Sequence, residues 1–309
     1  MSRIHDALKR AEQERATSTG THAEPVFEQP AFDPGAFQPA YDQPHVQREV
    51  MPNLQPSSGS GPGMPSVSNY ETLLARCAQG EWTPDSRTML FFNDDDARIG
   101  AEEFRTLRSR LYQIREKMPL KRLMVTSALP KEGKSFVAAN LAQVMVRQHG
   151  RRALVIDADL RNPGMHRHLG AAQSPGLGDY LMGQCDEFAA LQRGPMENLF
   201  FMPAGKPVGS APELLSNGRL KLLLQRVEPF FDWIILDTSP VIPVSDATLV
   251  AKFCDGILMV VRSNVTPSDM ARRAREEFPD KLLLGVVLNG AAPGEQSKYY
   301  YGDAMSGRT

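Results

Sequence analysis

Short apolar runs alternate with longer amphipathic segments from about residue 100 onward. Runs rich in β-branched and other apolar residues predict strands at 122–127, 152–157, 199–202, 233–237, 256–261 and 282–288. Apolar residues at helical spacing predict helices at 101–117, 135–148, 212–227, 245–254 and 267–277. Continuous apolar strands that alternate with helices are typical of a parallel sheet covered on both faces. The pattern therefore predicts an α/β three-layer sandwich with a mostly parallel sheet.

The first 100 residues follow a different pattern. Ile4, Leu8 and Ala11 form a thin apolar stripe, which predicts a short amphipathic helix, either a frayed terminal helix or one that docks on a partner. The next segment is rich in Pro, Gly, Ser and Gln, with nine Pro and five Gly, and burial there cannot offset the entropy of ordering. We expect a short helix at 1–16, a disordered linker at 17–69 and an extended lead-in at 70–100. A folded domain at 101–295 and a flexible tail at 296–309 should follow.

Composition narrows the class of protein. Lys and Arg total 35 and Asp and Glu total 36, so the net charge of −1 gives no electrostatic reason to expect nucleic-acid binding. Cys77, Cys185 and Cys254 lie far apart, which argues against a disulfide framework or a zinc site. The first residues lack the apolar region of a signal peptide, and no run reaches the ~18 apolar residues of a membrane span. We expect a cytoplasmic protein that reaches a membrane only through a partner.

Gly133-Lys134-Ser135 stands between the first predicted strand and the helix that follows it. In that position backbone N–H groups meet a β-phosphate, a lysine reaches the β- and γ-phosphates, and a serine hydroxyl holds Mg²⁺. Gly133 lets the backbone approach a phosphate without a Cβ. The tripeptide is a weak signal alone, and the full G-x-x-x-x-G-K-S/T pattern is not met because residue 128 is Ala.

Three aspartates stand at the ends of predicted strands. Asp157 and Asp159 end the second strand, and Asp237 ends the fourth. In a parallel sheet the carboxyl ends of the strands share one rim with the phosphate loop, so these carboxylates should converge near Ser135 and a Mg²⁺ ion. Any one of them alone would be interpreted as a helix cap or a solvated acid. Three of them around a phosphate loop favour a nucleotide site.

Other candidates carry less information. Asp246 opens a predicted helix and is interpreted as an N-terminal cap in preference to a metal contact. His166 and His168 form an isolated pair, interpreted as surface histidines. Arg262 and Asn289 end the last two strands, where they either contact a nucleotide base or ribose or form hydrogen bonds within a loop.

Together these motifs resemble the bacterial tyrosine kinases of capsular and exopolysaccharide synthesis, over about residues 100–302. The similar segments are the modified phosphate loop at 129–135, a second nucleotide motif at 154–163 and the Walker B stretch at 234–240. Two shorter segments, at 212–215 and 285–289, are also similar. The resemblance implies a P-loop ATPase fold and an ATP-dependent, non-specific protein-tyrosine autokinase. It also implies regulation of polysaccharide polymerisation and export, with ATP and Mg²⁺ as cofactors.

The resemblance also assigns site residues. Catalytic roles fall to Lys134, Asp157, Asp159 and Asp237, and among these we expect Asp159 to orient or deprotonate the tyrosine hydroxyl. Residues expected to bind the nucleotide are Lys131, Glu132, Gly133, Lys134, Ser135, Phe136, Arg262 and Asn289. Residues expected to hold the metal are Ser135, Asp157 and Asp237. Lys131 departs from the family pattern, which often has Gly there.

Two further motifs match the family. Charged residues at helical spacing resemble its oligomerisation motif, which implies a homo-oligomeric ring with contacts through Glu102, Arg105 and Arg108. The tail is similar to the tyrosine cluster that the family phosphorylates in trans, though shorter, with phosphoacceptors Tyr299, Tyr300 and Tyr301. The family often works with a membrane-spanning chain-length regulator, and we expect a separate one here.

Two alternative functions stay open. A non-catalytic, nucleotide-binding regulator of polysaccharide assembly would fit the short tyrosine tail. A partition or septum-positioning ATPase is less favoured, because those proteins look like dimers with an extra lysine early in the loop, where this chain has Leu129.

Overall fold

The computed structural model describes residues 70–92, 100–279 and 282–291, all within one unit of the chain that spans 63–309. The helix expected at 1–16, the linker at 17–69 and the tail at 296–309 lie outside the described residues. Among the described helices, none has the length and hydrophobicity needed to cross a membrane.

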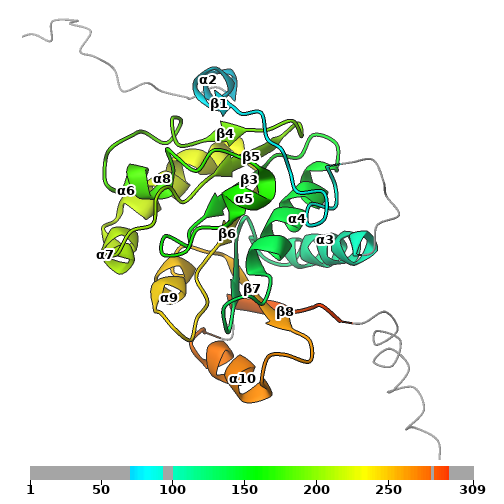
Figure 1. Cartoon of the computed structure of the whole chain (residues 1–309). Coiled ribbons are helices and arrows are strands. Elements are labelled where there is room, and N and C mark those ends of the chain that lie inside the picture. Colours follow the sequence, from blue (N-terminus) through cyan, green and yellow to red (C-terminus); the bar gives the residue numbers. More distant parts are fainter. Residues whose placement is uncertain (1–69, 93–99, 280–281, 292–309) are drawn as a thin grey trace, which may run out of the picture. The chain divides into compact units, whose positions relative to one another are not determined.

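An eight-stranded sheet lies between two layers of helices (Figure 1). Its strands are β1 (Ala78–Gln79), β2 (Arg122–Ser127), β3 (Ala153–Asp157), β4 (Gln192–Arg193), β5 (Leu199–Met202), β6 (Trp233–Asp237), β7 (Gly256–Arg262) and β8 (Leu283–Asn289). Their order across the sheet is β1-β4-β5-β3-β6-β2-β7-β8. Within the described part of the chain, only β4 and β5 pair antiparallel. The predicted α/β fold and all six predicted strands are confirmed, whereas the two-residue strands β1 and β4 escaped prediction.

The helices divide between the two faces of the sheet because alternate strand residues point to opposite faces. One face packs against α2 (Tyr70–Arg76), α6 (Leu177–Leu181), α7 (Ala211–Ser216), α8 (Arg219–Val227), α9 (Asp246–Ala251) and α10 (Ser268–Glu276), with the 3₁₀ turn η1 (Glu228–Phe230). The other packs against α3 (Ala101–Arg115), α4 (Lys134–Val146) and α5 (Met165–Leu169). The result is the expected three-layer sandwich.

Three local predictions need correction. The helix expected over 212–227 is two helices, α7 and α8, because Gly218 takes a left-handed conformation, with φ of +83°, that breaks the helix between them. The lead-in expected to be extended begins with α2. The five-residue helices α5 and α6 were not predicted, since they are too short for helical periodicity to show.

A segment that we call the strap, residues 80–92, crosses the face of the sheet that carries α4. Trp82, Met89 and Phe91 are buried there in the same apolar cluster as the inner side of α4. A Cβ on Gly194 would come within 2.2 Å of the Trp82 ring, so this close approach depends on a glycine. The strap is therefore part of the folded core.

The order of the central strands brings the candidate site together. Strand β6 lies between β3 and β2, and both neighbours run parallel to it. Asp157 stands opposite Asp237 in the register of one pair, and Val125 stands opposite Asp237 in the other. The chain leaves β2 into the phosphate loop at this same rim, so the loop and both strand-end carboxylates meet as predicted.

Candidate active site

The phosphate loop joins β2 to α4 and turns sharply just before the helix. Gly133 has a φ of +97°, and Lys131 has a φ of +67°, a left-handed conformation that non-glycine residues rarely adopt. A Cβ at position 133 would come within 2.1 Å of Nδ2 of Asn289. Glycine is thus required at Gly133 both by the backbone angle and by the neighbouring side chain.

Residues from distant elements hold this loop in place. Glu132 is buried, with its Oε2 accepting a hydrogen bond of 2.8 Å from the backbone N–H of Leu129. The Thr266 hydroxyl donates to the other Glu132 oxygen. Arg262 Nη1 donates to the Lys131 carbonyl at 3.1 Å. The shape of the loop therefore depends on the end of β7 and the turn after it.

The two alternatives for Arg262 and Asn289 can now be compared with the structure. Asn289 Nδ2 donates to the Glu132 carbonyl at 2.9 Å, and Arg262 donates to the residue before it. Both side chains thus form hydrogen bonds to the phosphate loop. Phe136, also expected near the nucleotide, packs its ring edge-on against Phe104 with centroids 5.8 Å apart. Nucleotide contact by these three residues stays a prediction.

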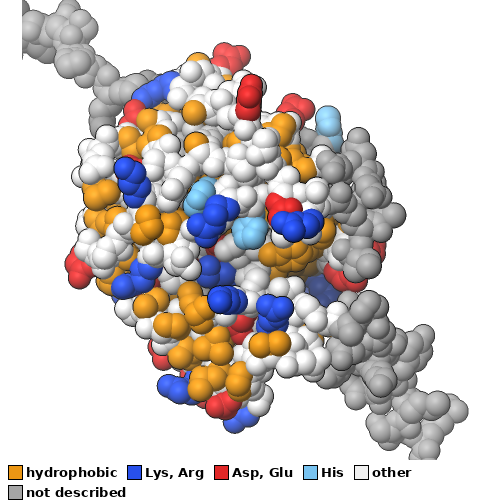
Figure 2. All heavy atoms as spheres, viewed as in Figure 1, with side chains coloured by type: hydrophobic (Ala, Val, Ile, Leu, Met, Phe, Trp, Pro, Cys, Tyr) orange, Lys and Arg blue, Asp and Glu red, His pale blue; other side chains and the backbone are white. Residues whose placement is uncertain are grey.

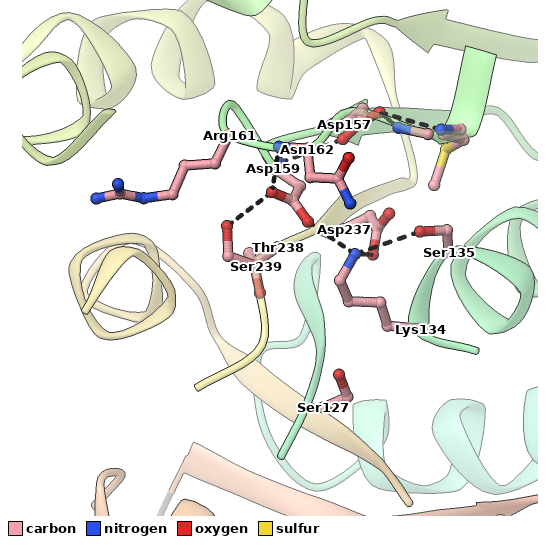
Figure 3. Close-up of polar contacts among 12 residues, drawn as sticks. Ser127, Lys134, Ser135, Asp157, Asp159, Arg161, Asn162, Asp237, Thr238 and Ser239 are labelled. Atoms are coloured by element: carbon pink, nitrogen blue, oxygen red, sulfur yellow. Dashed lines mark hydrogen bonds and ion pairs between the residues drawn. The ribbon is translucent and has the colours of Figure 1, made fainter. Parts of the chain in front are cut away.

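Lys134 lies at the centre of the carboxylate cluster. Figure 3 shows its side chain pointing between Asp159 and Asp237. Its Nζ lies 2.9 Å from Asp159 Oδ2, 3.8 Å from Asp237 Oδ1 and 3.5 Å from the Ser135 hydroxyl. Burial works to lower the pKa of Lys134, but the nearby carboxylates raise it above its usual value. Lys134 therefore carries its positive charge throughout the neutral range.

The two carboxylates at the strand ends are buried. Asp157 accepts hydrogen bonds of 3.2 Å from the backbone N–H groups of Asp159, Gly164 and Met165. Burial and the negative charge of Asp237 raise the pKa of Asp157 to about 7, against the attraction of Lys134. Burial also raises the pKa of Asp237 to about 6. These carboxyl groups are costly to ionise in the protein alone.

Asp237 is the least satisfied of the three. Neither of its carboxylate oxygens has a hydrogen-bond partner in the described part of the chain. A buried carboxylate that faces Lys134 at 3.8 Å but accepts no hydrogen bond from the described residues, beside a serine hydroxyl, suits a hard divalent cation such as Mg²⁺, which takes oxygen ligands. No cluster of three or more His, Cys, Asp or Glu able to hold a metal occurs among the described residues. Mg²⁺ does not need one, because it commonly keeps several waters and binds one or two carboxylates with phosphate oxygens.

Asp159 has partners on both of its oxygens. Its Oδ1 accepts hydrogen bonds from the Ser239 hydroxyl at 2.9 Å and from the Asn162 backbone N–H at 3.1 Å, while Lys134 faces Oδ2. Ser239 was not singled out from the sequence. Its only sequence signal is a polar residue two positions beyond Asp237, inside the stretch already compared with Walker B.

The interpretation of Asp246 as a helix cap was wrong. Ser245 occupies the N-cap position of α9, and no side chain caps that helix by a hydrogen bond. Asp246 is buried in the first turn, where it forms an ion pair of 2.7 Å with Arg161 Nε. Arg161 points away from the carboxylate cluster in Figure 3, so this pair anchors the β3 loop to α9. His166 and His168 are partly exposed, and burial lowers the pKa of both.

The predicted subunit motif does not lie on one free face. Arg105 forms an exposed ion pair of 3.2 Å with Glu102. Arg108 turns inward and donates to the Val144 carbonyl at 2.9 Å, near the end of α4. The three tail tyrosines lie outside the described residues. Figure 2 shows Lys and Arg side chains gathered in the middle of the viewed face, with hydrophobic side chains scattered in small groups.

Comparison with known proteins gives a consistent result. No protein-family model matches the chain. The tyrosine-protein kinase YwqD of Bacillus subtilis is 34% identical over 66% of this chain and 87% of its own length. The succinoglycan biosynthesis transport protein ExoP of Rhizobium meliloti is 33% identical over 64% of this chain, which spans only 26% of that longer protein.

Solved structures agree with these relatives. The kinase domain of the Escherichia coli tyrosine kinase ETK matches with a TM-score of 0.59 and 29% identity, over 64% of this chain and 78% of that one. The chimerical protein CapA2B2 matches with a TM-score of 0.61 and 27% identity, over 71% of this chain and 96% of that one.

Proposed function

We propose a function from one premise: the chain belongs to the family of bacterial tyrosine kinases. On that premise it is an ATP-dependent protein-tyrosine kinase that regulates the synthesis or export of an exopolysaccharide or capsule. The observation that carries the proposal is the position of Lys134. Its ammonium group lies among buried carboxylates at the sheet rim, on the first residue of a helix that follows a phosphate loop.

The proposed chemistry depends on charge and position. The first turn of α4 directs backbone N–H groups toward the phosphates of ATP, and Lys134 adds a positive charge that balances them. Ser135, Asp157 and Asp237 would hold Mg²⁺, which supplies further charge neutralisation for phosphoryl transfer. The oxygens of Asp237, which accept no hydrogen bond from the described residues, favour this assignment.

Asp159 is proposed to orient the tyrosine that receives the phosphate. Its Oδ1 is held by Ser239 and Asn162, and its Oδ2 faces Lys134. When Lys134 binds phosphate, Oδ2 becomes available to accept the proton of a tyrosine hydroxyl. This is the arrangement that general-base assistance requires.

The acceptors proposed are the tyrosines of a neighbouring copy, Tyr299, Tyr300 and Tyr301. Contacts between copies in a ring are assigned to Glu102 and Arg105, since Arg108 already binds the end of α4. Each phosphate adds a charge of about −1.5 to −2. Several phosphates on one tail would therefore repel neighbouring acidic groups and loosen the assembly.

The proposed setting is the cytoplasmic side of a membrane, reached through a separate membrane-spanning chain-length regulator. The support is indirect: the chain is similar to about a quarter of a succinoglycan biosynthesis transport protein. Mixing the chain with vesicles that carry a candidate regulator, and measuring co-sedimentation, tests this part of the proposal.

Lys134→Met tests the activity. The full chain is incubated with ATP and Mg²⁺, and phosphotyrosine is mapped by mass spectrometry. We expect phosphate on the tail tyrosines of the wild type and a loss of at least about 10²–10³-fold in Lys134→Met, because the charge that balances the phosphates is gone.

Lys252→Met is the matched control, because Lys252 is an exposed residue at the end of α9. It should keep the wild-type rate. Equal phosphorylation of wild type and Lys134→Met would contradict the proposal. ATP binding without phosphotyrosine, with or without the regulator present, would favour the non-catalytic regulator instead.

A further inference from the structure

Ser239 is the one side-chain hydroxyl that contacts Asp159 among the described residues. It lies two positions after the end of β6 and is 1% exposed. Its Oγ donates a hydrogen bond of 2.9 Å to Asp159 Oδ1. The two residues are 80 positions apart in the sequence, so the tertiary fold alone creates this contact.

The backbone around Ser239 is fixed on both sides. The Thr238 N–H donates to the Val125 carbonyl at 3.1 Å, and the Val241 N–H donates to the Ser127 carbonyl at 2.8 Å. The Thr126 hydroxyl donates to the carbonyl of Ser239 itself at 3.0 Å. All three bonds come from the end of β2, the strand that leads into the phosphate loop. The Ser239 hydroxyl is therefore held at a fixed position relative to that loop.

The two oxygens of Asp159 differ in what holds them. Oδ2 is paired with Lys134, which binds the phosphates of ATP in the proposed function. Oδ1 keeps the Ser239 hydroxyl and the Asn162 N–H whether or not Lys134 moves. A carboxylate held through one oxygen keeps its plane and presents the other oxygen in a defined direction.

We propose that Ser239 is a positioning residue for phosphoryl transfer: it holds Oδ1 of Asp159, so that Oδ2 faces the tyrosine hydroxyl. This inference rests on the proposed kinase function. In the step it serves, the tyrosine O–H bond breaks and its proton passes to Oδ2. The phenolic oxygen bonds to the γ-phosphorus of ATP, and the bond from that phosphorus to the bridging oxygen breaks, its electron pair leaving on ADP.

Ser239→Ala in the full chain is the first test. The turnover number for phosphotyrosine formation should fall about tenfold or more, since a general base that loses its orientation loses part of its contribution. The dissociation constant for ATP should stay within about twofold, because the Ser239 hydroxyl donates its hydrogen bond to Asp159 and not to the phosphate loop. Ser239→Thr keeps the hydroxyl and should restore most of the turnover.

Thr238→Val is the matched control. Thr238 is buried beside Ser239, but its hydroxyl donates to the Val125 carbonyl at 3.3 Å and not to Asp159. Thr238→Val removes one buried hydroxyl from the same strand end. A loss of turnover in Thr238→Val equal to that in Ser239→Ala would overturn the inference, because the effect would then follow from damage to the strand end.

The Asp159→Asn variant separates the test of Ser239 from the test of the proposed kinase function. In Asp159→Asn, the further change Ser239→Ala should cost no additional turnover, because Ser239 acts through Asp159. Losses that multiply in the double variant would overturn the inference. If Asp159→Asn lowers turnover and Ser239→Ala does not, Ser239 is not a positioning residue and the kinase function stands. If Asp159→Asn has no effect, the role proposed for Asp159 fails together with that of Ser239.

Ser239→Cys covers the case in which Ser239→Ala does not fold, as judged by its melting temperature. The thiol is close in shape to the hydroxyl but is a weak donor. A folded Ser239→Cys with lowered turnover and unchanged ATP binding supports the inference. A folded Ser239→Cys with wild-type turnover overturns it.

Discussion

Two groups of polar residues lie on helix α4, one partly buried at its first turn and one buried near its middle. The first turn contributes Lys134 and Ser135 to the carboxylate cluster, in which both oxygens of Asp237 have no hydrogen-bond partner in the described residues. The middle contributes Asn140 and Gln143, which are completely buried. The two groups are separated by less than two turns of one helix and satisfy their polar atoms in different ways.

The middle group is saturated with hydrogen bonds. Asn140 donates to the carbonyls of Thr88 and Phe136 at 2.8 and 2.9 Å and accepts from the Leu90 N–H at 2.8 Å. Gln143 accepts from the Phe91 N–H at 3.1 Å. These amides replace the backbone partners that the strap would otherwise lack, so the group fastens the strap to the core.

The difference between the groups separates a structural role from a functional one. Neutral, fully paired amides cost little to bury and hold two segments together. Buried carboxylates with raised pKa values and oxygens that accept no hydrogen bond cost stability, and such costs gather where a ligand is to bind. The first turn of α4 faces such a carboxylate, Asp237, and belongs to the candidate site, whereas the hydrogen-bonded amides in the middle of the helix are a structural support.

The largest effect on stability is expected from Asn140→Leu. The substitution nearly keeps the side-chain volume but removes the partner of the buried Leu90 N–H and the hydrogen bond to the partly buried Thr88 carbonyl. The free energy of unfolding should fall by about 2–4 kcal/mol, measured by urea denaturation. ATP affinity should change by less than about threefold at temperatures well below unfolding, because the substitution removes one hydrogen bond to the first turn of α4, at the Phe136 carbonyl, and leaves Lys134 and Ser135 unchanged.

Gln148→Ala, an exposed amide just beyond the same helix, is the control and should change the free energy of unfolding by less than about 0.5 kcal/mol. A similarly small change in Asn140→Leu would show that the amide does not hold the strap. The contrast between the two groups on α4 would then be lost.

Asp237→Asn should behave oppositely to Asn140→Leu: it should lose activity and gain stability. Because the folded pKa of Asp237 is raised from 3.8 to about 6, its ionised form costs stability above that pH. The variant should be more stable than the wild type by about 1–2 kcal/mol at pH 8.

This gain should shrink as the pH falls through 6, because the wild-type carboxyl then takes up a proton in the folded state. Urea denaturation of both proteins at pH 5, 6, 7 and 8 measures the difference, in which the contributions of His166 and His168 cancel. Loss of the Asp237 charge also lowers the pKa of Asp157, which adds to the same trend. Glu81→Gln, at an exposed carboxylate of the strap, should show no such trend. A stability gain independent of pH would mean that the charge of Asp237 is not its cause.

Arg108→Ala is expected to give the smallest effect. Its guanidinium bonds to the Val144 carbonyl, near the end of α4, where helix carbonyls lack partners of their own. The free energy of unfolding should fall by about 0.5–1.5 kcal/mol. Arg105→Ala breaks an exposed ion pair with Glu102 and should cost less than about 0.5 kcal/mol. If the two variants are equally stable in thermal melts, the inward contact of Arg108 contributes nothing.

Local patterns predicted much of the fold. The runs at 153–156 and 233–236 are wholly apolar, which is typical of a strand buried on both faces, and both lie within strands. The pattern failed where a single residue divides a helix or where a helix is too short to show a period. Gly218 divides a predicted helix, and α5 and α6 are too short to show a period.

The candidate site was predicted in part, for a topological reason. Lys134, Asp157 and Asp237 meet because parallel strands deliver their carboxyl ends to one rim, a rule that needs no coordinates. Asp246 was misinterpreted because its partner, Arg161, lies 85 positions away. The pairing of Ser239 with Asp159 escaped notice for the same reason.

The sequence by itself therefore determined the strands, the phosphate loop and the acids placed at strand ends, because each is a local property of consecutive residues. The tertiary structure alone decided which side chains hold one another. It turned Arg108 inward, closed Arg262 and Asn289 onto the phosphate loop and left Asp237 without a hydrogen-bond partner among the described residues. Those outcomes depend on strand order and register, which set distances between residues that no local pattern connects.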